Sequence, residues 1–508
     1  MHNSDKDYIK KLNPQKAQGP DQIPPRVLKE ISKEIAKPLS MLFNKSLESG
    51  EIPKEWKFAE VTAIFKKGNK TDPGNYRPVS LTCICCKIME QFVRDEIVNH
   101  MTENELYSKC QHGFRKHRSC ITQLIEVYDK MTELIDDGKN IDVVYLDFKK
   151  AFDSIPHERL LLKMKGYGIT GQTLDWVRAF LSGRNQKVKI GNSYSSRSEV
   201  TSGIPQGSIL GPVLFTIFIN DLPEALNVHC KVFADDTKIY DDVRKSKEIQ
   251  RDLYCMQEWT EKWNLYFNVS KCKVMHIGKN NPKTNYFMKI ENEQQKIEIC
   301  KEEKDLGITF DENLNFDLHI NNITKKANQM LGVIRRTFDF ISKNIFSKLY
   351  KSLVRSHLEY GNVIWSPYLK RQSIQIESVQ RRATKLVPEC KNMSYTQRLK
   401  YLKLFSLKGR RLRGDLIQTY KICQNLDEVD KDIMPLSTYT GTRNQGDKMR
   451  RRFSKTNIRK FTFTNRVVEH WNSLPLEVKN SPTLNTFKNR LDKVPKFLEK
   501  FFEYDERT

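Results

Sequence analysis

The segment that most constrains the fold is CKVFADDTKIY, residues 230–240, where two aspartates interrupt an otherwise strand-like run. Adjacent carboxylates repel each other and are unfavourable inside a strand. We therefore expect a β-hairpin over this segment, with Asp235 and Asp236 at its tip. Because a lone pair of aspartates is most often an exposed turn, the neighbouring segments decide whether this pair is functional.

A third carboxylate follows a buried-strand pattern earlier in the chain. The segment NIDVVYLDFKKAF, residues 140–152, begins as an apolar, β-branched run, and Asp147 stands at the end of that run. If this strand and the hairpin are neighbours in one sheet, the three carboxylates meet at one end of it. They could not all stay ionised without a counter-charge, which a pair of divalent cations supplies. Oxygen ligands favour Mg²⁺, which completes its shell with substrate phosphates.

Helical and strand-like segments alternate along the first 320 residues. The patterns predict a strand at 59–65, a hairpin at 186–200 that turns at Gly191 and Asn192, and helices at 22–50, 84–106, 172–183 and 208–226. Helices interleaved with hairpins indicate an α+β fold. From about residue 320 the pattern is mostly helical, and 463–493 is predicted to be a small helical module.

The positive charge is concentrated in the last part of the chain. The 508 residues carry a formal net charge of +25, and residues 321–508 alone hold 39 Lys and Arg against 17 Asp and Glu. Such a surface attracts a polyanion, most simply nucleic acid, although a merely soluble basic face explains the charge alone equally well.

The cysteines and the hydropathy of the chain limit which cellular compartments are expected for this protein. The 11 cysteines show no zinc-ligand spacing and are expected to be free thiols in a reducing compartment. The N-terminus has no apolar signal core, and the longest apolar run, residues 212–219, is far shorter than the ~20 residues of a membrane span. We expect a soluble intracellular protein of the cytoplasm, the nucleus or both.

Three motifs in a fixed order give the first resemblance. The segments LDFKKAFD (146–153), GIPQGSILGP (203–212) and FADD (233–236) together resemble the reverse transcriptases of non-long-terminal-repeat retrotransposons, of the jockey and chicken-repeat type. The palm motifs are specific, and the C-terminal ones are only suggestive. Further matches in the same order lie at residues 16–30, 75–93, 111–124, 263–275, 304–311, 357–367, 379–387 and 471–478.

The resemblance implies an α+β right-hand polymerase with fingers, an antiparallel palm sheet with helices packed on one face, and a helical thumb. The implied domains are an N-terminal extension (1–45), fingers and palm (46–315), a helical basic thumb (316–425) and a basic C-terminal module (426–508). The implied reaction is RNA-directed DNA synthesis. A DNA primer 3′-hydroxyl is extended with deoxynucleoside triphosphates on an RNA template, with two Mg²⁺ ions, or Mn²⁺ in their place.

The resemblance also assigns roles to single residues. Asp147, Asp235 and Asp236 match the metal-binding carboxylates, and the backbone carbonyl of Phe148 would be a further metal ligand. Lys271 matches a lysine that protonates the departing pyrophosphate as a general acid.

Residues on the nucleotide side are assigned in the same way: Lys66, Arg77, Phe152, Gln206 and Gly207. Phe152 matches the steric gate against a ribose 2′-hydroxyl, with an ordinary core aromatic as the alternative. Lys66 and Arg77 match fingers residues that grip the triphosphate. For Lys66 a solvated charge run is an equal alternative, and this chain has Phe65 where relatives often have a proline.

Two basic segments, residues 379–387 and 447–463, interleave Lys and Arg with apolar and aromatic residues, as suits backbone tracking and base stacking. A solvated helical face is the alternative. The candidate nucleic-acid-binding residues are Arg381, Arg382, Lys385, Arg450, Arg451 and Arg452.

Two alternative hypotheses about the function remain. We expect no endonuclease ahead of residue 16 and no RNase H domain in 320–508, so an inactive, truncated retrotransposon copy that only binds nucleic acid is the main alternative. The three aspartates argue against it. A telomerase-type or intron-encoded polymerase is a third possibility, weakened by the jockey-like C-terminal segments.

Overall fold

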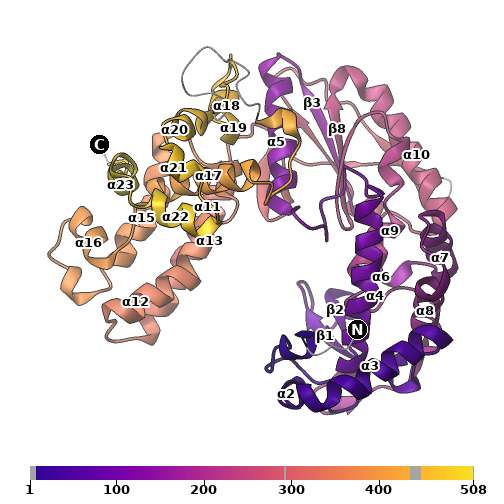
Figure 1. Cartoon of the computed structure of the whole chain (residues 1–508). Helices are drawn as coiled ribbons and strands as arrows, with labels where there is room; N and C mark the ends of the chain where they lie inside the picture. The colour runs from indigo at the N-terminus through magenta and orange to yellow at the C-terminus, as the bar shows by residue number, and fades with distance from the viewer. Residues whose placement is uncertain (1–6, 291–292, 435–447, 507–508) are drawn as a thin grey trace.

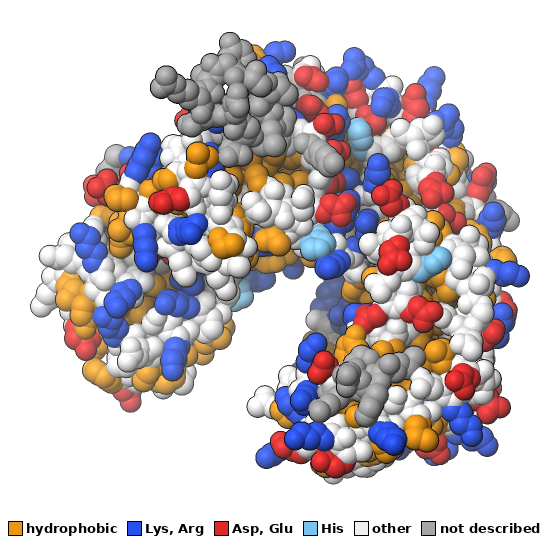
Figure 2. Space-filling view, in the orientation of Figure 1, with side chains coloured by type: hydrophobic (Ala, Val, Ile, Leu, Met, Phe, Trp, Pro, Cys, Tyr) orange, Lys and Arg blue, Asp and Glu red, His pale blue; other side chains and the backbone are white. Residues whose placement is uncertain are grey.

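The computed structural model describes residues 7–290, 293–434 and 448–506, and these form an open arch (Figure 1). The N-terminal elements build one arm and the C-terminal elements the other, with a β-sheet between them at the crown. Figure 2 shows a broad hollow between the two arms. Asp447, at the start of the predicted basic segment 447–463, and part of the predicted module 426–508 lie outside the described residues.

The N-terminal arm combines helices with a small sheet. The helix predicted at 22–50 is two helices, α2 (Pro25–Glu30) and α3 (Ser32–Ser49), and it ends at Gly50 with φ 67° as expected. The hairpin predicted at 186–200 is confirmed, since Ile190 pairs with Ser193 around the loop of Gly191 and Asn192. The sheet consists of β1 (Phe58–Phe65), β2 (Tyr76–Leu81), β4 (Arg184–Ile190), β5 (Ser193–Tyr194) and β6 (Ser198–Val200).

The sheet at the crown is the predicted palm sheet. Its strand order is β12-β9-β3-β8-β7, antiparallel except between β12 and β9. Its strands are β3 (Ile141–Leu146), β7 (His229–Phe233), β8 (Asp236–Asp242), β9 (Lys273–Ile277) and β12 (Glu298–Ile299). The smaller hairpins are β10 (Phe287–Ile290) with β11 (Glu293–Lys296), and β13 (Glu302–Asp305) with β14 (Ile308–Asp311).

Helices cover both faces of the palm sheet, and the prediction that they pack on one face is wrong. Val144 belongs to a core shared with α9 (Gly211–Phe218) and α10 (Ser246–Trp263), whereas Val143 belongs to a core shared with α5 (Cys120–Asp136). Successive residues of a strand point to opposite faces, so two adjacent fully buried valines require cover on both. Figure 1 shows α5 and α10 on opposite sides of β3 and β8.

The helix predicted at 208–226 is too long. It ends at Phe218, and a separate 3₁₀ turn spans Leu222–Ala225. Pro223 explains the break, because its ring would clash with the carbonyl of residue 219 in a continuous helix. The other helices of this half are α4 (Ile84–Glu103) and α8 (Gly171–Leu181), close to prediction, with α6 (Ala151–Ser154) and α7 (His157–Gly166).

The predicted helical character beyond residue 320 is confirmed. The C-terminal arm contains α11 (Asp317–Thr337), α12 (Lys343–Leu349), a π-helical turn (Tyr350–Val354), α13 (Arg355–Glu359), α14 (Asn362–Trp365), α15 (Lys370–Thr384), α16 (Tyr395–Leu402) and α17 (Leu407–Cys423). The last helices are α18 (Asn457–Lys460), α19 (Phe463–Arg466), α20 (Val468–Asn472), α21 (Leu476–Lys479), α22 (Leu484–Leu491) and α23 (Pro495–Phe502). They pack directly on the preceding ones, with the Phe487 ring stacked on Tyr420 at 4.3 Å. No helix in the described part of the chain is long and apolar enough to cross a membrane.

Candidate active site

The palm sheet brings the three aspartates together. Strands β3 and β8 are antiparallel neighbours in which Leu146 pairs with Thr237. Asp147 therefore follows β3 directly opposite Asp236, the first residue of β8. Asp235 lies in the two-residue loop that joins β7 to β8, because Phe233 pairs with Asp236. The expected hairpin and its place beside the earlier strand are both confirmed.

The hairpin tip has a constrained backbone. Ala234 has φ 54°, a left-handed conformation that is unfavourable for a residue with a Cβ atom. The Gln111 side-chain oxygen accepts hydrogen bonds from the N–H groups of Gly113, at 2.6 Å, and Ala234, at 3.2 Å. A Cβ atom on Gly113 would lie 2.4 Å from the Ala234 nitrogen. The buried Gln111, which our sequence reasoning did not single out, thus holds the turn that carries Asp235.

The hairpin carboxylates are in an unfavourable electrostatic environment. Burial raises the pKa of Asp235, and the charge of Asp147 raises it further. Burial, with the charge of Asp235 next, raises the pKa of Asp236 to about 6. Positive counter-charge at this point would relieve the repulsion. The described part of the chain contains no group of three or more Asp, Glu, His or Cys side chains that could hold a metal ion by itself.

Asp147 has an unused acceptor atom. Its Oδ2 is buried and accepts no hydrogen bond within the described residues, although the Lys271 ammonium lies 3.3 Å away. The next residue, Phe148, stacks on Phe267 at 4.4 Å. The two backbone hydrogen bonds of this bridge use the carbonyl of Asp147 and the N–H of Lys149, and neither uses the Phe148 carbonyl. The donor set at this end of β3 is therefore oxygen-rich and partly free of hydrogen bonds, which suits a hard divalent cation.

The segment 203–207 packs between β2 and the segment around α6, which follows Asp147 in the chain. The Phe152 ring stacks on Phe215 of α9 at 4.5 Å, and the Phe152 carbonyl accepts from the Ile204 N–H at 2.7 Å. The Gln206 side-chain amide donates to Asp153 Oδ1 at 2.9 Å. Phe152 and Gln206, far apart in sequence, thus border one site.

The fingers strand β2 holds the other side of this segment. The Ser80 N–H donates to the Gln206 carbonyl at 2.7 Å. Gly207 has φ 113°, and a Cβ atom there would lie 2.9 Å from the Ser80 carbonyl oxygen. Position 207 therefore requires glycine for both its conformation and its close approach to β2.

Lys66 and Arg77 lie on the fingers hairpin, within electrostatic range of Asp235. Lys66 follows β1 and Arg77 lies in β2, and both are exposed. Their charges offset part of the rise that burial causes in the Asp235 pKa. The structure thus places these two candidates with the carboxylates and leaves their ammonium and guanidinium groups accessible.

The six basic candidates of the C-terminal third differ in their local environments. Arg381 stacks over the rings of Tyr395, at 4.8 Å, and Tyr504, at 4.6 Å. Arg451 pairs with Glu469, and Arg452 lies 3.1 Å from Asp129 on α5. Arg382, Lys385 and Arg450 are exposed, as is Arg451, and Arg382 also donates to Asn328 Oδ1 at 3.0 Å.

Comparison with known proteins assigns the family. A model of the family described as reverse transcriptase (RNA-dependent DNA polymerase) matches residues 64–334, more than half of the chain. The chain belongs to the reverse transcriptase family. Its palm motifs, read from the sequence as a resemblance, therefore lie in a confirmed reverse transcriptase domain.

Proteins of mobile elements are among the relatives of this chain. The chain is 29% identical over 403 residues to the RNA-directed DNA polymerase from mobile element jockey of Drosophila melanogaster, covering 75% of this chain and 43% of that protein. It is 28% identical over 408 residues to the probable RNA-directed DNA polymerase from transposon BS of the same species, covering 75% and 44%. The reverse transcriptase chain thus spans less than half the length of these relatives, and the predicted jockey-type resemblance is confirmed.

Solved structures similar to this one include telomerases. The telomerase of Candida albicans in complex with a fragment of telomeric RNA matches with a TM-score of 0.40 and 9% identity, covering 74% of this chain and 69% of that one. The apo telomerase of Candida tropicalis matches with a TM-score of 0.38 and 10% identity, covering 56% and 59%.

Proposed function

We propose that this chain is the RNA-directed DNA polymerase of a jockey-type non-long-terminal-repeat retrotransposon. It extends a DNA primer 3′-hydroxyl with deoxynucleoside triphosphates on an RNA template. The observation that carries the proposal is the meeting of Asp147, Asp235 and Asp236 at one end of the palm sheet, within electrostatic range of Lys66 and Arg77.

Two Mg²⁺ ions, or Mn²⁺ in their place, would be held by Asp147, Asp235, Asp236 and the Phe148 carbonyl. The buried Asp147 Oδ2, which accepts no hydrogen bond and has a cation, the Lys271 ammonium, 3.3 Å away, and the raised pKa values of the hairpin aspartates fit a cation at this position. Substrate phosphates and water would complete the shells, because no cluster of side chains among the described residues forms a closed metal site alone. Bound there, such ions stabilise the attacking and leaving oxygens of an in-line phosphoryl displacement.

The surrounding side chains position the nucleotide. Lys66 and Arg77 hold the triphosphate, Arg77 as a bidentate fork and Lys66 as a mobile point charge. Phe152 excludes a ribose 2′-hydroxyl, and its stacking on Phe215 keeps the ring from turning aside. Lys271 donates a proton to pyrophosphate, and its contact with Asp147 keeps the ammonium near the reacting phosphates.

The template and primer lie in the hollow between the arms (Figure 2). The positive excess of residues 321–508 favours this placement, and Arg382, Lys385 and Arg450 are exposed for phosphate contact. Arg381, Arg451 and Arg452 also have partners within the chain, so their mutation would report on folding as well as on binding.

The test is Mg²⁺-dependent incorporation of deoxythymidine triphosphate on poly(rA)·oligo(dT). Wild type should incorporate, and Asp235→Asn/Asp236→Asn should not. The matched control is Asp241→Asn/Asp242→Asn, which removes the same two charges from the other end of β8 and should keep incorporation. Salt-sensitive duplex binding without incorporation by wild type would instead identify a protein that only binds nucleic acid.

A further inference from the structure

A buried carboxylate lies behind the segment that carries Gln206 and Gly207. Glu90, on α4, is 0% exposed. Its Oε2 atom accepts hydrogen bonds from the N–H groups of Ile209, at 2.6 Å, and Leu210, at 3.2 Å. These two residues form the turn between Gly207 and the start of α9.

Burial of a carboxylate in a protein core is unfavourable unless hydrogen bonds or positive charges compensate for its lost hydration. Burial raises the pKa of Glu90, and the two backbone N–H groups, followed by the charge of the buried Arg184, oppose that rise. Without Glu90, both N–H groups of this turn would be buried or half-buried with no partner, which is unfavourable. The carboxylate therefore specifies the conformation of the turn.

Hydrogen bonds within the turn connect the residues held by Glu90 to Gln206 and Gly207. Pro205 and Ser208 are joined by a backbone hydrogen bond of 3.1 Å, and the Ser208 hydroxyl accepts from the Gly211 N–H at 2.8 Å. The segment 205–211 is thus internally braced. Loss of the anchor at Ile209 would therefore loosen the turn as one piece and leave the Ser80 hydrogen bond as the remaining backbone anchor of Gln206.

We propose that Glu90 is a positioning residue for nucleotide binding, which fixes the 205–210 turn so that Gln206 and Gly207 present the correct surface to the incoming deoxynucleoside triphosphate. The proposal rests on the proposed polymerase function. Since Glu90 is buried, it acts only through the turn, so its loss weakens nucleotide affinity more than it slows the chemical step.

The chain offers a matched control in Glu377. This carboxylate of α15 is 1% exposed and accepts from the N–H groups of Leu407, at 2.9 Å, and Lys408, at 3.3 Å, at the start of α17. It repeats the local arrangement of Glu90 in the C-terminal arm. Glu377 also accepts from the Tyr395 hydroxyl and the Gln380 amide, so Glu377→Ala removes the same kind of backbone anchor and more besides, but only Glu90 lies behind the nucleotide-binding turn.

The experiment is single-nucleotide incorporation on poly(rA)·oligo(dT) over a range of deoxythymidine triphosphate concentrations. Glu90→Ala should raise KM about 10- to 100-fold with a smaller change in kcat, as expected for a displaced binding group. Glu90→Gln, which keeps an acceptor oxygen, should raise KM only about threefold, since neutral hydrogen bonds are weaker than charge-assisted ones. Glu377→Ala should leave KM unchanged.

Equal KM values for wild type and Glu90→Ala, or equal rises in Glu90→Ala and Glu377→Ala, would overturn the proposal. If Glu90→Ala does not fold, Glu90→Gln decides, and a wild-type KM there overturns it. Hydrogen exchange of the Ile209 and Leu210 amides, which needs no activity, should accelerate in Glu90→Ala. Exchange at the wild-type rate would overturn the anchoring itself, whereas a wild type that incorporates nothing would overturn the proposed function, and with it the nucleotide role.

Discussion

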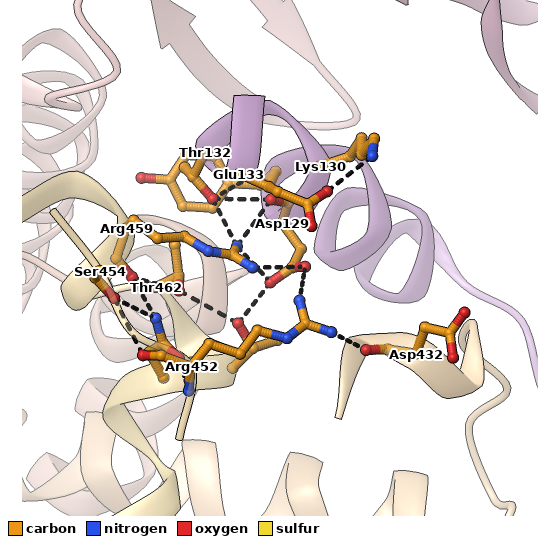
Figure 3. A network of polar contacts seen from close by, with 12 residues as sticks. Asp129, Lys130, Thr132, Glu133, Asp432, Arg452, Ser454, Arg459 and Thr462 are labelled. Atoms are coloured by element: carbon orange, nitrogen blue, oxygen red, sulfur yellow. Dashed lines mark hydrogen bonds and ion pairs between the residues drawn. The ribbon is translucent and has the colours of Figure 1, made fainter. Parts of the chain in front are cut away.

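Replacing Arg459 by alanine should loosen the C-terminal segment from helix α5. The Arg459 side chain is 3% exposed, and its guanidinium donates to Asp129 Oδ1 at 2.8 Å, to the Asp129 carbonyl at 2.8 Å and to the Thr132 hydroxyl at 3.0 Å. Figure 3 shows this network between α5 and the segment after residue 448. Arg459 is therefore the main partner of a carboxylate that is itself only 7% exposed.

The size of the expected free-energy loss depends on the partners that the buried Asp129 carboxylate would keep. Removing one partner of a buried ion pair typically costs about 3–5 kcal/mol, because the other charge remains buried. Here Asp129 would keep the Thr464 hydroxyl at 2.5 Å and Arg452 at 3.1 Å. We therefore expect the lower end, about 3 kcal/mol.

The assay is hydrogen exchange of the amides in 460–466, whose protection should fall about a hundredfold, since 1.4 kcal/mol corresponds to a factor of ten. The control is Arg451→Ala, because the pair of Arg451 and Glu469 is 42% and 73% exposed and should contribute less than about 1 kcal/mol. Replacing both partners, in Asp129→Asn/Arg459→Met, should recover part of the loss. A change in Arg459→Ala no larger than in Arg451→Ala would refute the reasoning.

Three further predictions concern the active site. Because the Asp236 pKa is raised from 3.8 to about 6, the metal-free protein should lose stability as pH rises from about 4 to 6, and Asp236→Asn should be more stable than wild type only above that window. The full cost would be about 3 kcal/mol, but the residue also keeps exposed surface, so solvent screening reduces the expected cost to about 1 kcal/mol. Urea unfolding with EDTA at pH 4 and pH 8 measures it, and the same difference between wild type and Asp236→Asn at both pH values would contradict it. Phe152→Val should increase the kcat/KM for ribonucleotides relative to deoxynucleotides at least about tenfold. If the ratio of the two kcat/KM values does not change, Phe152 is an ordinary core aromatic. Gly207→Ala should destabilise by about 1–3 kcal/mol and raise the nucleotide KM, because its Cβ meets the Ser80 carbonyl; wild-type values in thermal unfolding and incorporation assays would rule this out.

The local features of the palm were predictable from the sequence. A two-residue loop between alternating apolar residues marks the hairpin at Asp235, and an apolar run that ends at Asp147 marks a buried strand. These signals depend on neighbours within a few residues, so they can be read without knowing the fold. The cover on both faces of the sheet was missed, because a short apolar strand has the same pattern whether a second layer of helices is present or not.

The sequence by itself determined which residues could do the chemistry: the three aspartates, their order relative to the segment 203–212, and the strand and turn that carry each. Only the tertiary structure decided which partners those residues have. Glu90 meets the 205–210 turn across 119 positions of sequence, and Arg452 meets Asp129 across 323. Net charge could not separate Arg452, which is held in an internal network, from the exposed Arg450, because the environment of a charge is set by groups that only folding brings near it.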